Sequence, residues 1–158
     1  MIQGNFADNI LIANAGDDVL MGGGGSDRLY GGPGDDTYRW KLTDQNESID
    51  ENFSGGTDVL ELNSHWGMDD IAEDMTFMRS GNDLLIDLTF NGSLSQGVIS
   101  IKDMDESLSR VEVLRLNYVS GDSVDIDMQS IFDAANSTAQ AFQITEDTTA
   151  FGLIAAPV

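Results

Sequence analysis

A nine-residue repeat near the N-terminus constrains this chain more than any other feature of its sequence. Residues 4–39 divide without gaps into four units, GNFADNILI, ANAGDDVLM, GGGGSDRLY and GGPGDDTYR. The last two match the pattern G-G-x-G-x-D-x-U-x, where U is a large apolar residue, at every fixed position. The second unit keeps Gly16, Asp18 and Leu20, and the first has Asn9 in place of the aspartate. Four units in phase argue against a flexible glycine-rich linker, which needs no apolar residue at a fixed position.

Each unit combines a turn of six residues with a strand of three. Glycines at the first, second and fourth positions tolerate positive φ and let backbones approach closely. The last three positions alternate outward, inward and outward, as in a short strand. The inward side chains are therefore Leu11, Leu20, Leu29 and Tyr38. One unit cannot bury its inward residue alone, so the units must stack, two to each coil, on alternate sides.

Stacking places the acidic residues of the turns above one another. Each turn lies over the turn two units later, which brings Asn9 over Asp27 and Asp18 over Asp36. Carbonyl and carboxylate oxygens would line each gap, and calcium takes six to eight such oxygens in a tolerant geometry. Magnesium requires a stricter octahedron. Zinc prefers histidine or cysteine, and the chain has one histidine and no cysteine. The repeat therefore predicts calcium.

Two less regular coils are expected to follow the repeat. The acid-x-apolar ending of a unit recurs at 47–49 (ESI) and 58–60 (DVL), and the inward residues are then spaced by 11. By the same stacking, Asp58 would face Asp36, which makes Asp58 a candidate ligand. Glu47 is a weaker candidate, because no glycine closely precedes it.

Beyond these coils, alternating apolar segments predict an antiparallel sheet that caps the stack. The expected strands span 75–79, 84–90, 98–102 and 111–116, with turns at 80–83 and at the Asn-Gly-Ser of 91–93. Residues 127–137 are expected to form a short amphipathic helix with Met128, Ile131, Phe132 and Ala135 on one face.

The repeat resembles the calcium-binding nonapeptide of RTX (haemolysin-type) proteins, and 75–127 resembles the segment that commonly follows such repeats. The matching pieces are MTFMRSGNDLLIDL, GVISIKDM and VEVLRLNYVSGDSVDID, the last with Ser-Gly-Asp-Ser where Asp-Gly-Thr is usual. The resemblance implies an all-β fold. It consists of a parallel β-roll over 1–62, a small antiparallel cap over 63–126, and a short helix and tail over 127–158. Several calcium ions would be held by Asn9, Asp18, Asp27, Asp36, Asp58 and the carbonyls of Gly16, Gly23, Gly25, Gly32 and Gly34.

Charge and composition narrow the possible functions. A net charge of −21, from 28 acidic and seven basic residues, argues against nucleic acid and against anionic membranes. With 41% hydrophobic residues the chain can build a core, so the acidity indicates folding coupled to calcium. No apolar run approaches the roughly 18 residues of a membrane span. Neither a zinc-protease motif nor a G-x-S-x-G elbow occurs, and we expect a module without catalytic activity.

The resemblance also implies where the protein acts and what it is attached to. We expect the C-terminal part of a larger secreted bacterial protein, with an upstream domain, because the repeat begins directly after the N-terminus. Residues 139–158 resemble the uncleaved signal read by the type I secretion machinery, without the usual acid-then-apolar ending. Calcium outside the cell would trigger folding. The alternatives are a carbohydrate-binding module and a calcium-stiffened segment of a cell-surface adhesin. The open first coil is also expected to permit a homodimer.

Overall fold

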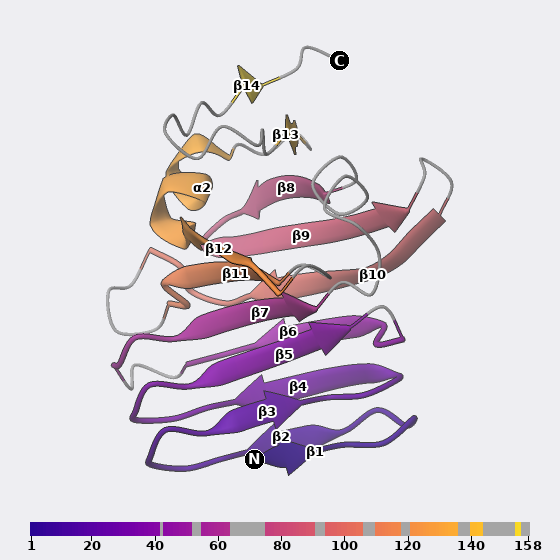
Figure 1. The fold of residues 1–158 in the computed structure, drawn as a ribbon, viewed down its shortest axis with the longest axis vertical. Helices are drawn as coiled ribbons and strands as arrows, with labels where there is room; N and C mark the ends of the chain where they lie inside the picture. Colours follow the sequence, from indigo (N-terminus) through magenta and orange to yellow (C-terminus); the bar gives the residue numbers. More distant parts are fainter. Residues whose placement is uncertain are drawn as a thin grey trace.

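The computed structural model of the protein describes residues 1–41, 43–51, 55–63, 75–90, 94–105, 110–117, 121–135, 140–143 and 154–155. Over these ranges the fold is all-β with one short helix (Figure 1). The first seven strands are β1 (Ile2–Gln3), β2 (Ile10–Ile12), β3 (Val19–Met21), β4 (Ser26–Tyr30), β5 (Thr37–Lys41), β6 (Asn46–Ile49) and β7 (Val59–Asn63). The later elements are β8 (Met75–Ser80), β9 (Asp83–Phe90), β10 (Leu94–Ile101), β11 (Val113–Asn117), β12 (Ser123–Asp127), α2 (Met128–Ala134), β13 (Gln140–Gln143) and β14 (Ile154–Ala155).

Successive strands of the N-terminal part alternate between two sheets, as the nine-residue rhythm predicts. One sheet has the order β1-β3-β5-β7-β11-β12, and the other has the order β14-β13-β8-β9-β10-β6-β4-β2. From β1 to β7, every pair within a sheet is parallel. Figure 1 shows the resulting rungs stacked from the N-terminal end. Both sheets become mixed further along, because antiparallel strands join them.

The inward residues of the repeat form the core of this stack. Leu20 pairs in register with Tyr38, and Tyr38 with Leu60, while Leu29 pairs with Ile49 in the other sheet. All five are at most 1% exposed. The inward phase predicted from the repeat is therefore confirmed, as is its continuation into the two 11-residue coils. Leu11, in the first coil, is partly buried and packs against the same core.

The segments expected to cap the stack form antiparallel hairpins, but they do not form a sheet of their own. β8 pairs with β9, β9 with β10, and β11 with β12, all antiparallel. However, β10 pairs in parallel with β6, and β11 in parallel with β7. Each of these two strands covers the edge that the last coil would otherwise leave unpaired. The hydrophobic core consequently continues from the coils into the hairpins without interruption.

The expected amphipathic helix is present as α2. Asp127 caps its N-terminus, where the Asp127 carboxylate accepts a hydrogen bond from Ser130 N at 3.0 Å. Met128, Ile131 and Phe132 are buried, and the Arg79 guanidinium lies 4.1 Å from the centre of the Phe132 ring. No helix within the described ranges has the length and apolar character needed to cross a bilayer. Most of the signal-like tail, and the predicted 91–93 turn, lie outside the described residues.

Candidate metal centre

The turns between strands are built on backbone conformations that favour glycine. At the second position of the last two units, Gly23 and Gly32 have φ of +93° and +98°. Asn14 holds the same position in the second unit with φ of 75°, which suits asparagine better than most other residues. The repeat pattern therefore persists structurally where its glycine is replaced.

Stacked turns also approach each other too closely for a side chain at these positions. A Cβ added to Gly32 would lie 2.1 Å from the carbonyl oxygen of Asn14, and one on Gly34 would lie 2.5 Å from that of Gly16. The predicted glycines thus lie in turns whose backbone oxygens face the next coil. One of these oxygens, that of Gly25, accepts a hydrogen bond from Asn46 N at 3.2 Å.

The acids beside one sheet form a ladder, which we call the first column: Asp18, Asp36, Asp58 and Glu112. Asp36 Oδ1 accepts Asp18 N at 2.8 Å, Asp58 Oδ1 accepts Asp36 N at 2.8 Å, and Glu112 Oε2 accepts Asp58 N at 2.7 Å. The predicted stacking of Asp18 on Asp36 and of Asp36 on Asp58 is present. The repeat pattern did not predict Glu112 in this column, because only the pairing of β11 with β7 brings it there.

The second column, beside the other sheet, consists of Asn9, Asp27 and Glu47. Asp27 Oδ1 accepts Asn9 N at 2.7 Å, and Asp27 pairs in register with Glu47. The Asn9 side-chain oxygen accepts Asn5 N at 2.7 Å, so it is used within its own turn. Asp27 and Glu47 are only 2% and 4% exposed. The structure therefore buries Glu47 in the same column as Asp27, despite the missing glycine.

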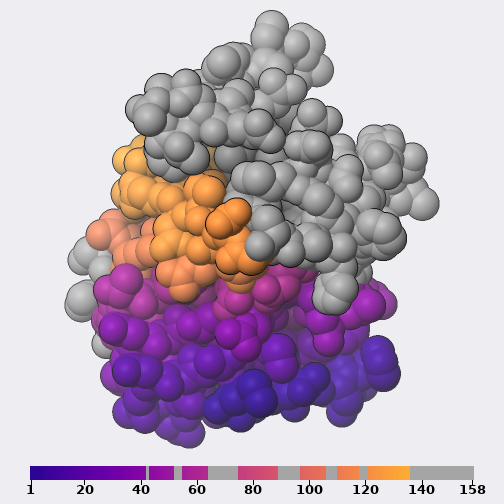
Figure 2. All heavy atoms as spheres, in the orientation of Figure 1, coloured from indigo at the N-terminus to yellow at the C-terminus, as the bar shows by residue number. Residues whose placement is uncertain are grey.

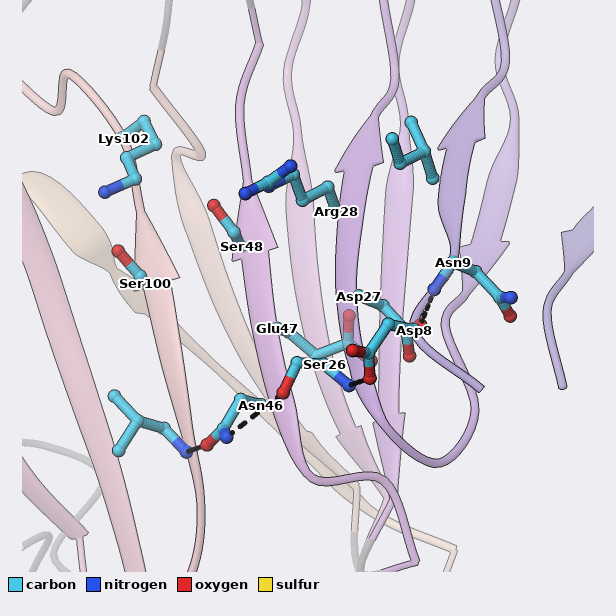
Figure 3. A pocket seen from close by; sticks show the side chains of 12 residues that line it. Asp8, Asn9, Ser26, Asp27, Arg28, Asn46, Glu47, Ser48, Ser100 and Lys102 are labelled. Atoms are coloured by element: carbon cyan, nitrogen blue, oxygen red, sulfur yellow. Dashed lines mark hydrogen bonds between the residues drawn. The ribbon is translucent and has the colours of Figure 1, made fainter. Parts of the chain in front are cut away.

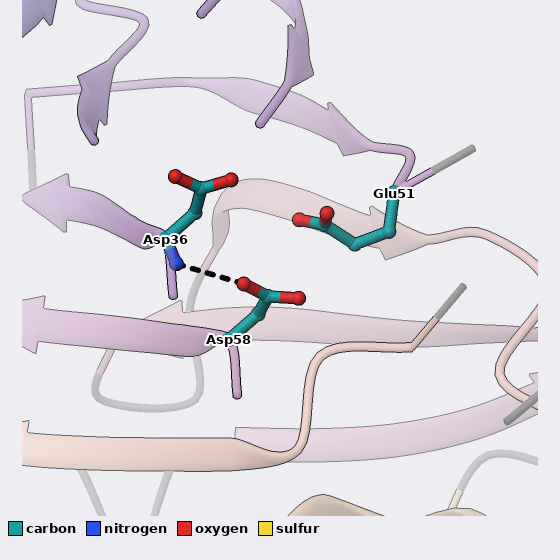
Figure 4. Close-up of side chains that lie close together, drawn as sticks. All are labelled: Asp36, Glu51 and Asp58. Carbon is teal, nitrogen blue, oxygen red and sulfur yellow. Dashed lines mark hydrogen bonds between the residues drawn. The ribbon is translucent and has the colours of Figure 1, made fainter. Parts of the chain in front are cut away.

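Three buried carboxylates lie close together, one from the last repeat unit and two from the residues that follow it: Asp36, Glu51 and Asp58 (Figure 4). One oxygen of each lies within 4.8 Å of the others, and none of the three residues is more than 2% exposed. The Tyr38 hydroxyl donates to Glu51 Oε1 and accepts Gly31 N at 2.8 Å. Glu51 was missed because it occupies the first position of a coil, where the regular units have glycine.

Burial and mutual repulsion disfavour the charged forms of these carboxylates. Burial is the main cause that raises the pKa of Asp27 and Asp36. It also raises the pKa of Glu47 to about 8, with Asp27 and Asp44 as further causes. The pKa of Asp58 rises to about 8 through burial and the nearby Glu51, Glu112 and Asp36. A cation placed among these groups would restore their charged forms.

A further row of acids, more exposed than the two columns, occupies the fifth position of the units. Asp8 Oδ1 accepts Ser26 N at 2.8 Å, Asp17 Oδ1 accepts Asp35 N at 3.0 Å, and Asp35 Oδ1 accepts Thr57 N at 2.8 Å. These side chains join one turn to the next on the outside of the stack. Sequence reasoning passed over them because serine holds this position in the third unit.

A groove of about 650 Å³ runs along the outer face of β2, β4, β6 and β10 and reaches the second column (Figure 3). Asp8, Asp27 and Glu47 line it, together with Arg28 and Lys102. The Lys102 ammonium is already paired with Asp83 at 2.7 Å. Asp27 and Glu47 thus border the groove, while their unpartnered carboxylate oxygens stay buried.

The donor set of both columns fits calcium. It consists of hard oxygen ligands only, and within the described residues Asp27 Oδ2 and Asp36 Oδ2 are buried with no hydrogen-bond partner. Residues 3–38 match the family model of the RTX calcium-binding nonapeptide repeat, in four copies. No curated protein matches the chain.

Proposed function

Because residues 3–38 are RTX calcium-binding nonapeptide repeats, we propose that this calcium-binding module folds when calcium fills the gaps between its stacked turns. The observation that carries the proposal is the pair of buried, unpartnered carboxylate oxygens on Asp27 and Asp36. Leaving such atoms unpaired costs free energy, and a divalent cation removes this cost.

The architecture that supports this function is a parallel β-roll over 1–62. The parallel pairing of β1 through β7 and the alternation between two sheets support it. We assign the cap to 63–126 and the helix and tail to 127–158. Figure 2 shows the coils of the repeat gathered at one end of the molecule.

The ligands in this proposal come from the two columns and the glycine turns. Asp18, Asp27, Asp36 and Asp58 supply carboxylate oxygens, while Gly16, Gly23, Gly25, Gly32 and Gly34 supply carbonyl oxygens. Asn9 contributes a neutral oxygen, which makes the first site weaker because fewer charges favour the ion. Bound calcium supplies positive charge that turns repulsion between the columns' carboxylates into attraction.

The biological role that follows is a folding switch outside the cell. With a net charge of −21, the calcium-free chain repels itself and stays unfolded in calcium-poor cytosol, which suits passage through a type I secretion channel. Extracellular calcium modules bind with dissociation constants of roughly 10⁻⁴–10⁻³ M, so their sites fill only after export. The folded roll then supports folding of an attached upstream domain.

The open first coil supports association with a second copy. β1 and β2 are the end strands of the two sheets. The exposed large apolar side chains of the described chain all lie on this coil, namely Met1, Phe6, Ile10 and Ile12, at 60% exposure or more. Large apolar side chains that are exposed together on one coil are typical of interaction sites.

Circular dichroism during a calcium titration tests the folding switch, with magnesium as the control ion. We expect the strand signal to be lost in chelator and restored by millimolar calcium but not by equal magnesium. A chain that keeps its full strand signal in chelator, and whose thermal stability does not change with calcium, would contradict the proposal.

A further inference from the structure

We propose that Glu47, which lies beyond the nonapeptide repeats, completes with Asp27 a site for a divalent cation, calcium by its chemistry, at the end of the second column. The inference rests on the proposed function and extends it. It adds a ligand that lies outside residues 3–38, and a site that the repeat pattern does not supply.

The first support is a concentration of unsatisfied carboxylate oxygens. Both Glu47 oxygens and Asp27 Oδ2 are buried and have no hydrogen-bond partner within the described residues. Glu47 is 4% exposed, so solvent does not satisfy it either. Native structures rarely bury an unpaired polar group, and a carboxylate with both oxygens unpaired is an extreme case that calls for an ion.

The second support is the arrangement of these oxygens around one small space beside Gly22. A Cβ placed on Gly22 would lie 2.4 Å from Glu47 Oε1, 2.5 Å from Asp27 Oδ2 and 2.7 Å from Glu47 Oε2. The three oxygens, from two strands, therefore face a common point that only glycine at position 22 leaves open. Figure 3 shows Glu47 and Asp27 side by side. Both residues also line the groove along β2, β4, β6 and β10.

The third support is the contrast with Glu112, which closes the first column as Glu47 closes the second. Glu112 Oε2 accepts Asp58 N at 2.7 Å, and Glu112 Oε1 lies 3.8 Å from Arg110 Nε. One oxygen of Glu112 thus has a backbone donor, and a cationic side chain lies near the other. In the next rung beyond Glu47, the paired residue is the apolar Ile99, which offers the carboxylate nothing.

The competing explanation is a proton shared between Glu47 and Asp27. The raised pKa of Glu47 is compatible with either explanation, since burial and the neighbouring Asp27 and Asp44 cause it in the absence of an ion. A cation and a shared proton differ in what a Glu47→Gln variant does. Glutamine keeps the size and one acceptor oxygen, but it removes the charge that a cation requires.

The experiment counts calcium ions bound to the full chain by isothermal titration calorimetry, for the wild type, Glu47→Gln and Asp133→Asn. Asp133 is exposed on α2, so its variant removes the same charge away from the columns. We expect Glu47→Gln to bind one ion fewer than the wild type, and Asp133→Asn to bind the same number. In chelator at acid pH, where the calcium-free chain folds, the Glu47→Gln variant should also melt at an equal or higher temperature, because glutamine is neutral without taking up a proton.

A second variant shows whether a lost ion reflects the lost charge or a misfolded chain. Glu47→Asp keeps the charge and shortens the reach, so it should retain the ion count while weakening one site at least tenfold. If Glu47→Gln binds as many ions as the wild type with unchanged affinities, the shared proton is correct and this inference fails while the proposed function stands. If the wild type binds no calcium, the proposed function fails with it.

Discussion

At the scale of single residues, the buried acids make stability depend on pH in opposite ways with and without calcium. Glu47 and Asp58 have folded-state pKa values of about 8, above the ordinary values of 4.5 and 3.8. The calcium-free fold therefore binds more protons than the unfolded chain. Its stability is greatest below about pH 4 and is lost as pH rises towards 8.

We accordingly expect the chain in chelator to regain its fold at acid pH, with a melting temperature that falls as pH rises from about 5 until the fold is lost on the way to about 8.5, since both groups lose their protons over that range. In saturating calcium the trend should reverse, because ions replace protons and bind more tightly as the carboxylates ionise. Thermal unfolding in parallel pH series checks both trends. A melting temperature in chelator that rises with pH would contradict the assigned burial of these groups.

Substituting two different glycines distinguishes the cost of backbone strain from the cost of a steric clash. Gly16 and Gly32 both have positive φ, of +125° and +98°. A Cβ on Gly16 has no neighbour within 4 Å, whereas one on Gly32 meets the Asn14 carbonyl oxygen at 2.1 Å. We expect Gly16→Ala to lower the free energy of unfolding by about 1–2 kcal/mol through strain alone. Gly32→Ala should cost clearly more. Urea unfolding in saturating calcium measures the difference, and equal losses would refute the close stacking of the turns.

At the scale of elements, each nine-residue unit gains its stability from the single inward residue of its strand. Leu29 in β4 is 1% exposed, so Leu29→Ala should destabilise by about 2–5 kcal/mol. Leu11 occupies the same phase in β2 but is only partly buried, and Leu11→Ala should cost less. Chemical denaturation of both variants tests this order. A Leu11 variant as damaging as the Leu29 variant would mean that the first coil is covered in solution.

The local pattern predicted the coils but not all of the acids that line them. Leu20, Leu29 and Tyr38 could be assigned inward, because their phase depends only on residues a few positions away. Glu112 could not be assigned to the first column, since 54 residues separate it from Asp58. Glu51 could not be assigned either, because a glutamate replaces the glycine that marks the start of a coil. Periodicity identifies repeated positions, whereas these acids reach the columns through pairing across longer spacers.

The local range of the sequence pattern also explains why the pairing of the cap with the coils was not predicted. Alternation within 84–90 and 98–102 predicts a hairpin, and β9 and β10 form one. The alternation of apolar and polar residues does not predict which edge strand of the coils the hairpin will pair with. The structure joins β10 to β6 and β11 to β7, so the hairpins extend both sheets of the coils.

At the scale of the whole molecule, the uncovered first coil predicts self-association. Phe6 is 90% exposed and Ile10 62% exposed on the end coil. We expect the calcium-loaded protein to dimerise with rising concentration in light scattering coupled to gel filtration, and Phe6→Ser to return it to a monomer. Asp133→Asn, on α2 away from this coil, serves as the control. A wild type that remains monomeric at all concentrations would show that this end does not bind a second copy.

The contact between Tyr38 and Glu51 makes the molecule its own optical probe. The phenol hydroxyl donates to a carboxylate of the Asp36–Glu51–Asp58 cluster, so the ring stands next to any ion held there. A luminescent lanthanide in place of calcium would receive excitation from this ring, and a Tyr38→Phe variant would keep the ring while releasing Glu51. Light emitted on ultraviolet excitation would then report how this one cluster fills, in a protein that needs no added dye.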